Sequence, residues 1–141
     1  VLLIAAGAAW LAGRWVPVAP WTGTPVTAVA VLLALAGLAL MAWALIGFIR
    51  HRTSVHPMHP ERARHLLTGG AYAISRNPIY LADALLLTAW IVWLGQPIGL
   101  LMLPLFVLYL QRFQIQPEER VLQQRFGNNY SRYRQTTRRW L

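Results

Sequence analysis

The chain has 141 residues, of which 57% are hydrophobic and 12% are charged, whereas an ordinary soluble domain has about a quarter of its residues charged. Thirteen arginines, no lysine and four acidic residues give a formal net charge of +9, which is typical of proteins that bind nucleic acid or an anionic membrane surface. Cysteine is absent, so disulfides, thiolate catalysis and cysteine-ligated metal sites are excluded.

The first two apolar segments cover residues 1–12 and 26–48. The first is short and begins without a methionine or a basic stretch, so we interpret it as a truncated membrane helix, with the remains of a signal peptide as the alternative. The second carries no charge and predicts a helix about 34 Å long, which suffices to cross a hydrocarbon core of about 30 Å. These segments favour a membrane protein over a nucleic-acid-binding protein.

Two further apolar segments, residues 79–94 and 98–110, are separated only by the sequence GQP. Glycine and proline together mark a tight turn, so these segments predict an antiparallel helical hairpin. The predicted fold is an all-α integral membrane protein of about four transmembrane helices, the first truncated, in a single domain. It comprises two N-terminal helices (1–49), a loop (50–78), the hairpin (79–110) and a tail (111–141).

The distribution of arginines predicts the orientation of the chain. Five arginines lie between residues 50 and 76 and seven lie after residue 111, whereas only Arg14 lies between the first two segments. Because basic residues collect on the cytoplasmic side of a membrane, the middle loop and the tail are both expected in the cytoplasm, as four spans also require. Neither piece can bury a core alone, so we expect a site where the two meet.

The tail predicts a helix that begins at Pro117 and stops at Gly127. Glu118 shares one face of this helix with the apolar residues four and eight positions later, so it should turn inward, while Glu119 points elsewhere. The alternative is that both acids only complement the dipole at the start of the helix.

Common catalytic motifs are missing from the sequence, including the glycine-rich phosphate loops and the G-x-S-x-G elbow. The three histidines between residues 51 and 59 show no recurring ligand spacing, so a metal site is not predicted. Asp83 lies in an apolar segment and is a functional candidate by default. The alternative is that Asp83 is solvated or paired with Arg76.

The stretch HLLTGGAYAISRNPIY, residues 65–80, concentrates polar and flexible residues at the start of the third apolar segment. Gly69 and Gly70 permit close approach to a ligand, and Tyr72 and Tyr80 offer aromatic faces with hydroxyl groups. Arg76 and Asn77 directly precede Pro78 and lie at a helix start, where an anionic group can be bound. The pattern predicts a pocket for a ligand with an anionic end and a cationic or planar part; the alternative is a membrane-entry cap with interfacial tyrosines.

Two motifs in this order resemble the isoprenylcysteine carboxyl methyltransferase family, whose members are related to the phospholipid N-methyltransferases. They are LLTGGAYAISRNPIYLA and, about forty residues later, PEERVLQQRFGNNYSRYRQTTRRWL. The resemblance covers about residues 53–141, and the helical hairpin between the motifs adds to its specificity. It implies a membrane methyltransferase that uses S-adenosyl-L-methionine.

The resemblance also implies which residues contact the cofactor. The positions that match are Arg64, His65, Leu66, Leu67, Tyr72, Asn77, Pro78, Ile79, Tyr80 and Glu118. Asn77 stands where the family has histidine, and because an asparagine cannot carry a proton, we interpret this position as a hydrogen-bonding one. The family's substrate-binding arginine aligns with Gln114, so Arg112, two residues earlier, is the candidate substrate ligand.

The sequence therefore predicts methyl transfer at the membrane interface to a lipophilic acceptor, such as the carboxylate of a prenylcysteine. This reaction needs alignment more than acid–base groups, so no residue is assigned a chemical role in catalysis. Several alternatives remain open. They are a phospholipid or amine N-methyltransferase, a non-catalytic scaffold with an arginine-rich lipid-binding tail, and a relative that uses the pocket for another reaction, such as a reductase.

Overall fold

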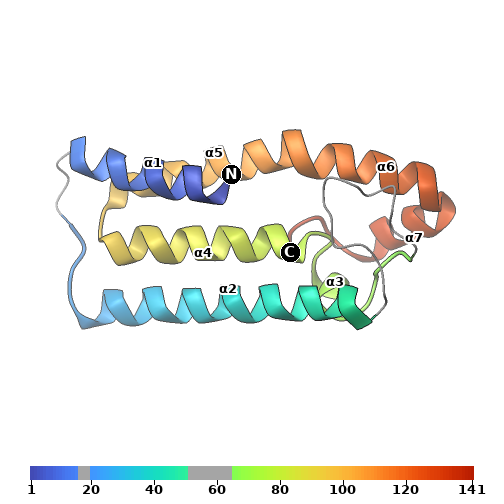
Figure 1. Cartoon of the computed structure of the whole chain (residues 1–141), viewed down its shortest axis with the longest axis horizontal. Helices are drawn as coiled ribbons and strands as arrows, with labels where there is room; N and C mark the ends of the chain where they lie inside the picture. Colours follow the sequence, from blue (N-terminus) through green and yellow to red (C-terminus); the bar gives the residue numbers. More distant parts are fainter. Residues whose placement is uncertain (16–19, 51–64) are drawn as a thin grey trace. The chain divides into compact units, whose positions relative to one another are not determined.

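The computed structural model describes residues 1–15, 20–50 and 65–141, and every regular element within them is helical (Figure 1). The elements are α1 (Leu2–Trp15), α2 (Thr24–Arg50), α3 (Ala71–Ile74), α4 (Pro78–Leu94), the 3₁₀ helix η2 (Pro97–Leu101), α5 (Met102–Leu110), the π-helical η3 (Gln111–Ile115), α6 (Gln116–Phe126) and α7 (Asn128–Thr136). The predicted all-α class is confirmed for these residues. The four apolar segments coincide with α1, α2, α4 and the η2–α5 pair.

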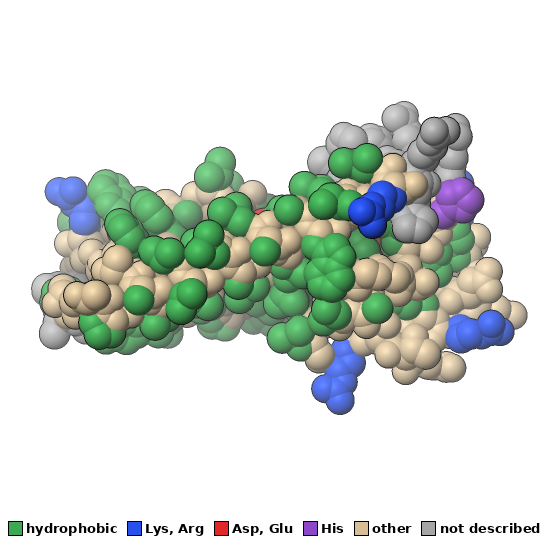
Figure 2. All heavy atoms as spheres, turned by 90° about the horizontal axis from the view of Figure 1, so that it is seen from below, with side chains coloured by type: hydrophobic (Ala, Val, Ile, Leu, Met, Phe, Trp, Pro, Cys, Tyr) green, Lys and Arg blue, Asp and Glu red, His purple; other side chains and the backbone are tan. Residues whose placement is uncertain are grey.

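Two helices are long and apolar enough to cross a membrane: Thr24–Arg50, with 27 residues, and Pro97–Phe126, with 30 residues. Only 17% and 22% of their most apolar windows are buried within the protein. Burial this low distinguishes them from the core helices of soluble proteins, because their apolar side chains face outward. Figure 2 shows hydrophobic side chains along the face that carries α2. The helices Leu2–Trp15 and Pro78–Leu94 are apolar but shorter.

One compact unit contains residues 1–39 and 82–109, and its helices pack through small residues. A Cβ atom built on Gly37 of α2 would lie 3.0 Å from Leu86 Cγ of α4, so glycine permits these helices to approach closely. The Trp90 indole N–H donates to the Ala6 carbonyl of α1 at 3.1 Å. The apolar helices of this unit are therefore in direct contact.

The turn of the predicted hairpin is built on Gly95, which adopts a φ of 65°. A Cβ atom there would collide with the carbonyl of Trp21, whose own N–H donates to the Gly95 carbonyl at 2.7 Å. Glycine is needed at this position both for its backbone conformation and for the close approach of Trp21. The expected turn between α4 and the following apolar segment is confirmed.

The predicted tail helix is α6, which begins at Gln116, one residue before Pro117, but it has no free start because the helix is continuous from Pro97 to Phe126. Proline inside a helix lacks an N–H group, and its ring clashes with the carbonyl four residues earlier. The chain accommodates it by the π-helical segment η3 immediately before α6, where the Gln116 N–H donates to the Gln111 carbonyl. A helix dipole therefore cannot account for Glu118 and Glu119, because they do not lie at a free helix start.

The second compact unit contains residues 40–81 and 110–141, which include every sequence-predicted site residue that the structure describes. Its most deeply buried side chains are Leu110, Ile115 and Tyr130. Gly127 has a φ of 49° and separates α6 from α7, so that the prediction of a helix stop at this glycine is confirmed.

Candidate functional site

The segment before α4 is placed by a left-handed glycine and by aromatic contacts with the end of α2. Gly70 has a φ of 62°, and the Tyr72 N–H donates to the Gly69 carbonyl at 3.2 Å, which closes a turn into α3. The Tyr72 ring stacks edge-on against Phe48 of α2, with ring centroids 5.5 Å apart. This packing fixes the direction in which the Tyr72 hydroxyl points.

Tyr80 and Glu118 lie together within this unit, although 38 residues separate them in the sequence. The Tyr80 side chain is 8% exposed, and its hydroxyl donates to Glu118 Oε2 at 3.3 Å. Burial raises the pKa of Glu118 to about 7; the Tyr80 hydrogen bond opposes this rise, and the charge of Glu119 adds to it. Glu118 lies in the part of its helix beyond the apolar stretch, because 20 residues from Pro97 already span about 30 Å.

Tyr72 and Tyr133 extend this cluster toward α7. The Tyr133 hydroxyl donates to the Tyr72 carbonyl at 2.6 Å, so that α7 is fastened to α3. Burial raises the pKa of both phenols, and the nearby charge of Glu118 raises the pKa of Tyr72 further. Three tyrosines and one carboxylate therefore share a single buried neighbourhood.

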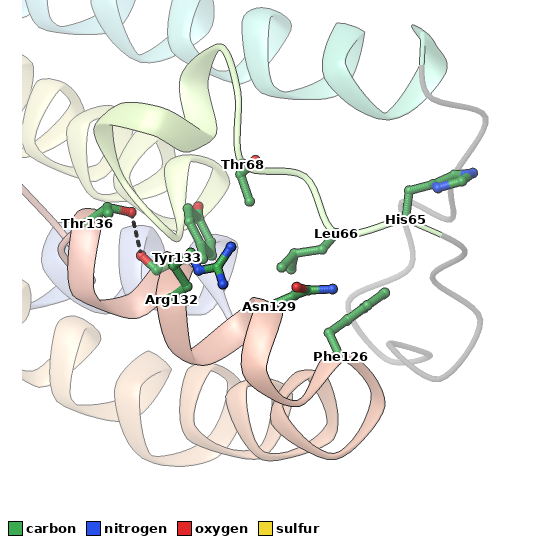
Figure 3. Close-up of a pocket in the computed structure, with 8 residues that line it drawn as sticks. All are labelled: His65, Leu66, Thr68, Phe126, Asn129, Arg132, Tyr133 and Thr136. Carbon is green, nitrogen blue, oxygen red and sulfur yellow. Dashed lines mark hydrogen bonds between the residues drawn. The ribbon is translucent and has the colours of Figure 1, made fainter.

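A cavity of about 600 Å³ opens between the residue 65–68 segment and α7 (Figure 3). Its lining combines aromatic, aliphatic, amide, hydroxyl and cationic groups, namely His65, Leu66, Thr68, Phe126, Asn129, Arg132, Tyr133 and Thr136. Figure 3 shows Leu66 reaching from its loop toward Asn129 on α7. Tyr133 belongs to both the cavity wall and the tyrosine–glutamate cluster, so the two are adjacent. The volume falls within the range of small-molecule sites.

Glu119, which the helical spacing turns away from the face of Glu118, is the centre of a buried ion-pair network. Arg139 holds it in a bidentate contact of 3.1 and 2.7 Å, and Arg76 Nη2 lies 3.2 Å from its Oε1. The side chains of Glu119 and Arg76 are only 11% and 9% exposed. Arg76 therefore pairs with Glu119 rather than with Asp83. The helical stripe did not reveal this network because both arginines come from distant segments.

Asn77 binds the C-terminal segment of the chain. Its side-chain amide donates to the Arg139 carbonyl at 2.9 Å, and the Ser75 hydroxyl donates to the same oxygen at 3.2 Å. The Arg76 N–H donates to the Arg138 carbonyl at 3.0 Å. The Asn77 side-chain amide, the Ser75 hydroxyl and the Arg76 backbone N–H are thus satisfied by the tail, whereas contact of Asn77 with a cofactor stays a prediction.

The other sequence-predicted residues are placed as follows. Pro78 is buried, Leu67 and Ile79 are half-buried, and His65 is exposed at the cavity edge. Leu67 also packs toward α2, where its Cδ1 lies 3.9 Å from a Cβ atom built on Gly47. Arg112 is exposed on η3 and does not line the cavity. Arg64 and the three histidines between residues 51 and 59 lie outside the described residues.

Sequence reasoning missed the wall of the cavity that α7 contributes. Asn129, Arg132, Tyr133 and Thr136 recur at the three- and four-residue spacing of one helical face. That spacing, after the helix-stopping Gly127, was the available signal. This spacing does not by itself predict a cavity, because the sequence of α7 is mostly polar and the periodicity of polar residues does not distinguish a face in contact with solvent from a face that lines a cavity.

Comparison with known proteins identifies the family. Residues 25–129, about three quarters of the chain, match the family model described as phospholipid methyltransferase. An uncharacterized protein of Haemophilus influenzae is 44% identical over 63 residues, which are 45% of this chain and 100% of that protein. No solved structure matches the chain significantly. The family match, together with the exposed apolar helices, establishes that this chain belongs to the phospholipid methyltransferase family of membrane methyltransferases.

Proposed function

We propose that the protein is an S-adenosyl-L-methionine-dependent methyltransferase that modifies a lipophilic acceptor at the membrane interface. The observation that carries this proposal is the contrast between two adjacent carboxylates. Glu119 is paired with two arginines, whereas Glu118 contacts only the Tyr80 hydroxyl among the described hydrogen bonds and ion pairs. A half-buried carboxylate whose pKa is raised to about 7 by desolvation gains strongly from a cationic ligand.

The described residues fit such a cofactor. The cavity of about 600 Å³ suits a nucleoside-sized molecule, and Phe126 and Tyr133 provide aromatic faces on its wall. Asn129 and Thr68 provide hydrogen-bonding groups, and Arg132 provides a cation for a carboxylate. Tyr72 and Tyr80 place further aromatic surface beside Glu118, where a cation is favoured.

The residues of the chain bind and align the reactants rather than act as acids or bases. When bound, the cofactor supplies an activated methyl group, which leaves its sulfonium sulfur as a neutral thioether and forms one new bond to the acceptor. Glu118 offsets the positive charge of the donor, and Tyr80 orients the carboxylate. Alignment of this kind is sufficient for an in-line transfer.

The site residues come from segments that adjoin the apolar helices in the sequence, so we expect a water-soluble donor and a membrane acceptor to meet there. We place the 65–80 segment and the residues after 111 on the cytoplasmic side, because most of the arginines lie in the middle loop and the tail. Twelve of the thirteen arginines lie in these two regions, which is the asymmetry expected of a multi-pass protein in the cytoplasmic membrane.

The family match favours the amine of a phospholipid headgroup as the acceptor. An amine acceptor must also release a proton to water or to a neighbouring base. A prenylcysteine carboxylate, the acceptor that the sequence resemblance favours, needs no deprotonation and would be bound by an exposed arginine such as Arg112. We take the amine as the first candidate and the carboxylate as the second.

Calorimetry on the detergent-purified protein tests the cofactor. We expect saturable binding of S-adenosyl-L-methionine that Glu118→Gln weakens at least about tenfold, since a hydrogen bond to a charged group contributes about 1.5–3 kcal/mol. Gln135→Ala, an exposed change on α7, is the matched control and should leave the affinity unchanged. Absence of binding by the intact protein would refute the proposal.

The acceptor is identified by incubating membranes that contain the protein with methyl-labelled donor. The labelled lipid is then treated with base. Methyl esters release labelled methanol under this treatment, whereas N-methylamines retain the label. Retained label supports the phospholipid amine, and released methanol supports the carboxylate.

A further inference from the structure

A second concave surface lies on α6 and α7, away from the cavity described above. This groove has a volume of about 430 Å³ and is lined by three glutamines, two arginines and one glutamate, namely Gln116, Gln123, Gln124, Arg120, Arg134 and Glu119. None of these residues lines the cavity between residues 65–68 and α7. The groove is therefore a separate polar surface.

Helical geometry turns the groove arginines away from Glu118 on α6 and away from the cavity residues on α7. Arg120 follows Glu118 by two residues, which is a rotation of about 200° around α6. On α7, Arg134 follows the cavity residue Arg132 by the same interval. A molecule held by Arg120 and Arg134 is thus turned away from Glu118 and cannot be the methyl acceptor.

Positive charge exceeds negative charge at this groove. Its carboxylate, Glu119, is already engaged by Arg76 at 3.2 Å and Arg139 at 2.7 Å. Arg120 and Arg134 add two exposed guanidinium groups. Within the described residues, Nε and Nη1 of Arg76 are also buried without a hydrogen-bond partner. The carboxylate in the lining is therefore neutralised by arginines outside the lining, and the charges of Arg120 and Arg134 make the groove favour an anion.

Placing one membrane boundary at Pro97 puts the groove at the level of the lipid headgroups on the other side. The helix that begins at Pro97 needs about 20 residues to span a hydrocarbon core of about 30 Å, which brings its boundary to Gln116. Arg120 lies four residues further, or about 6 Å beyond that boundary. Each headgroup layer is about 5–8 Å thick, so Arg120 stands at the level of the phosphates.

We propose that this groove binds the phosphate of an anionic glycerophospholipid that is not the substrate. Arg120 and Arg134 contact the phosphate, and the glutamine amides contact the polar headgroup beyond it. The bound lipid holds α6 and α7 against the membrane while Glu118 and the cavity residues of α7 point away from the groove. The proposal rests on the membrane placement of the helix given above, but it does not require S-adenosyl-L-methionine to bind.

Native mass spectrometry of the detergent-solubilised protein tests the groove with phosphatidylglycerol as the probe. The double variant Arg120→Gln/Arg134→Gln removes both groove arginines, and Arg125→Gln/Arg138→Gln removes the same charge from exposed positions outside the groove. We expect apparent affinity to fall about tenfold in the first double variant, because two charge-assisted contacts are lost. It should change less than about twofold in the second. Zwitterionic phosphatidylcholine should bind the wild-type protein more weakly than phosphatidylglycerol.

Three results would overturn the proposal. Equal losses in the two double variants would indicate attraction by overall charge instead of a groove. Equal binding of the two lipids would remove the preference for an anion. Displacement of phosphatidylglycerol by an equal concentration of inorganic phosphate would indicate that the groove binds a soluble phosphate instead of a lipid. The thermal midpoints of both double variants in phosphatidylcholine micelles should be equal, which shows that both variants are folded. Both variants should also bind the methyl donor with unchanged affinity in calorimetry, which separates this test from the test of the proposed function.

Discussion

Replacing Glu118 by glutamine should change how the stability of the protein depends on pH. Burial raises the pKa of Glu118 from 4.5 to about 7 in the folded protein. The folded state then binds more protons than the unfolded state between these values, so this group contributes a stability that is complete below pH 4.5 and is lost as the pH rises to about 7. At about 1.4 kcal/mol per pH unit, the loss is about 3 kcal/mol. Glutamine keeps an acceptor for Tyr80 but has no charge to bury.

The assay is denaturant unfolding in micelles, followed by tryptophan fluorescence at several pH values between 4 and 8. The quantity to plot is the free energy of unfolding of the variant minus that of the wild-type protein, because groups common to both cancel. We expect this difference to grow by about 3 kcal/mol in favour of Glu118→Gln between pH 4.5 and pH 7. Tyr80→Phe removes the hydrogen bond that lowers the pKa of Glu118, so the change should move to higher pH. A difference that stays flat across this range would refute the buried-carboxylate interpretation.

Three further predictions concern the framework of the site. Gly70→Ala should lower the free energy of unfolding by about 1–2 kcal/mol, because its φ of 62° is strained for alanine and a Cβ atom would lie 3.3 Å from Trp43 Nε1. Gly69→Ala is the control, because the space around its Cβ position is open. Equal losses of thermal stability in the two variants would contradict this prediction. Glu119→Gln should cost about 3–5 kcal/mol in chemical denaturation, because it leaves the buried Arg76 without its counter-charge, whereas Gln124→Ala at the exposed rim should cost little. Asn77→Leu should destabilise the protein by about 1 kcal/mol, because it removes the donor to the Arg139 carbonyl. Asn77→His retains a donor and should therefore keep more of the stability and more of the affinity for the methyl donor. Identical behaviour of the two variants would show that the amide contact is unimportant.

The helical framework was largely readable from the sequence, because uninterrupted apolar runs and a Gly–Pro turn are local signals. Residues 26–48 and 79–94 were predicted, and α2 (Thr24–Arg50) and α4 (Pro78–Leu94) enclose them within two residues at each end. The turn at Gly95 followed from the same local chemistry. By contrast, the continuous helix through Pro117 depends on a π-helical adjustment in η3, and the sequence around it does not encode that adjustment in any residue type.

The site was only partly predictable, for a different reason. Helical spacing predicts that Glu118 turns inward, and in the structure its carboxylate accepts a hydrogen bond from Tyr80. The same spacing did not reveal the partners of Glu119, because Arg76 and Arg139 reach it from other parts of the chain. Periodicity describes one helix at a time, whereas the partners of a buried charge are set by tertiary packing.

The hydrogen bonds between the start of α4 and the C-terminal segment impose an order of events on synthesis. Asn77 and Ser75 leave the ribosome 62 and 64 residues before the Arg139 carbonyl that they bind. The helices α4, α5, α6 and α7 all lie between these residues in the sequence, so both polar groups are synthesised well before their partner. Closure of the polar unit is therefore a late, long-range step, and a stalled or shortened chain would present its membrane helices without a finished site.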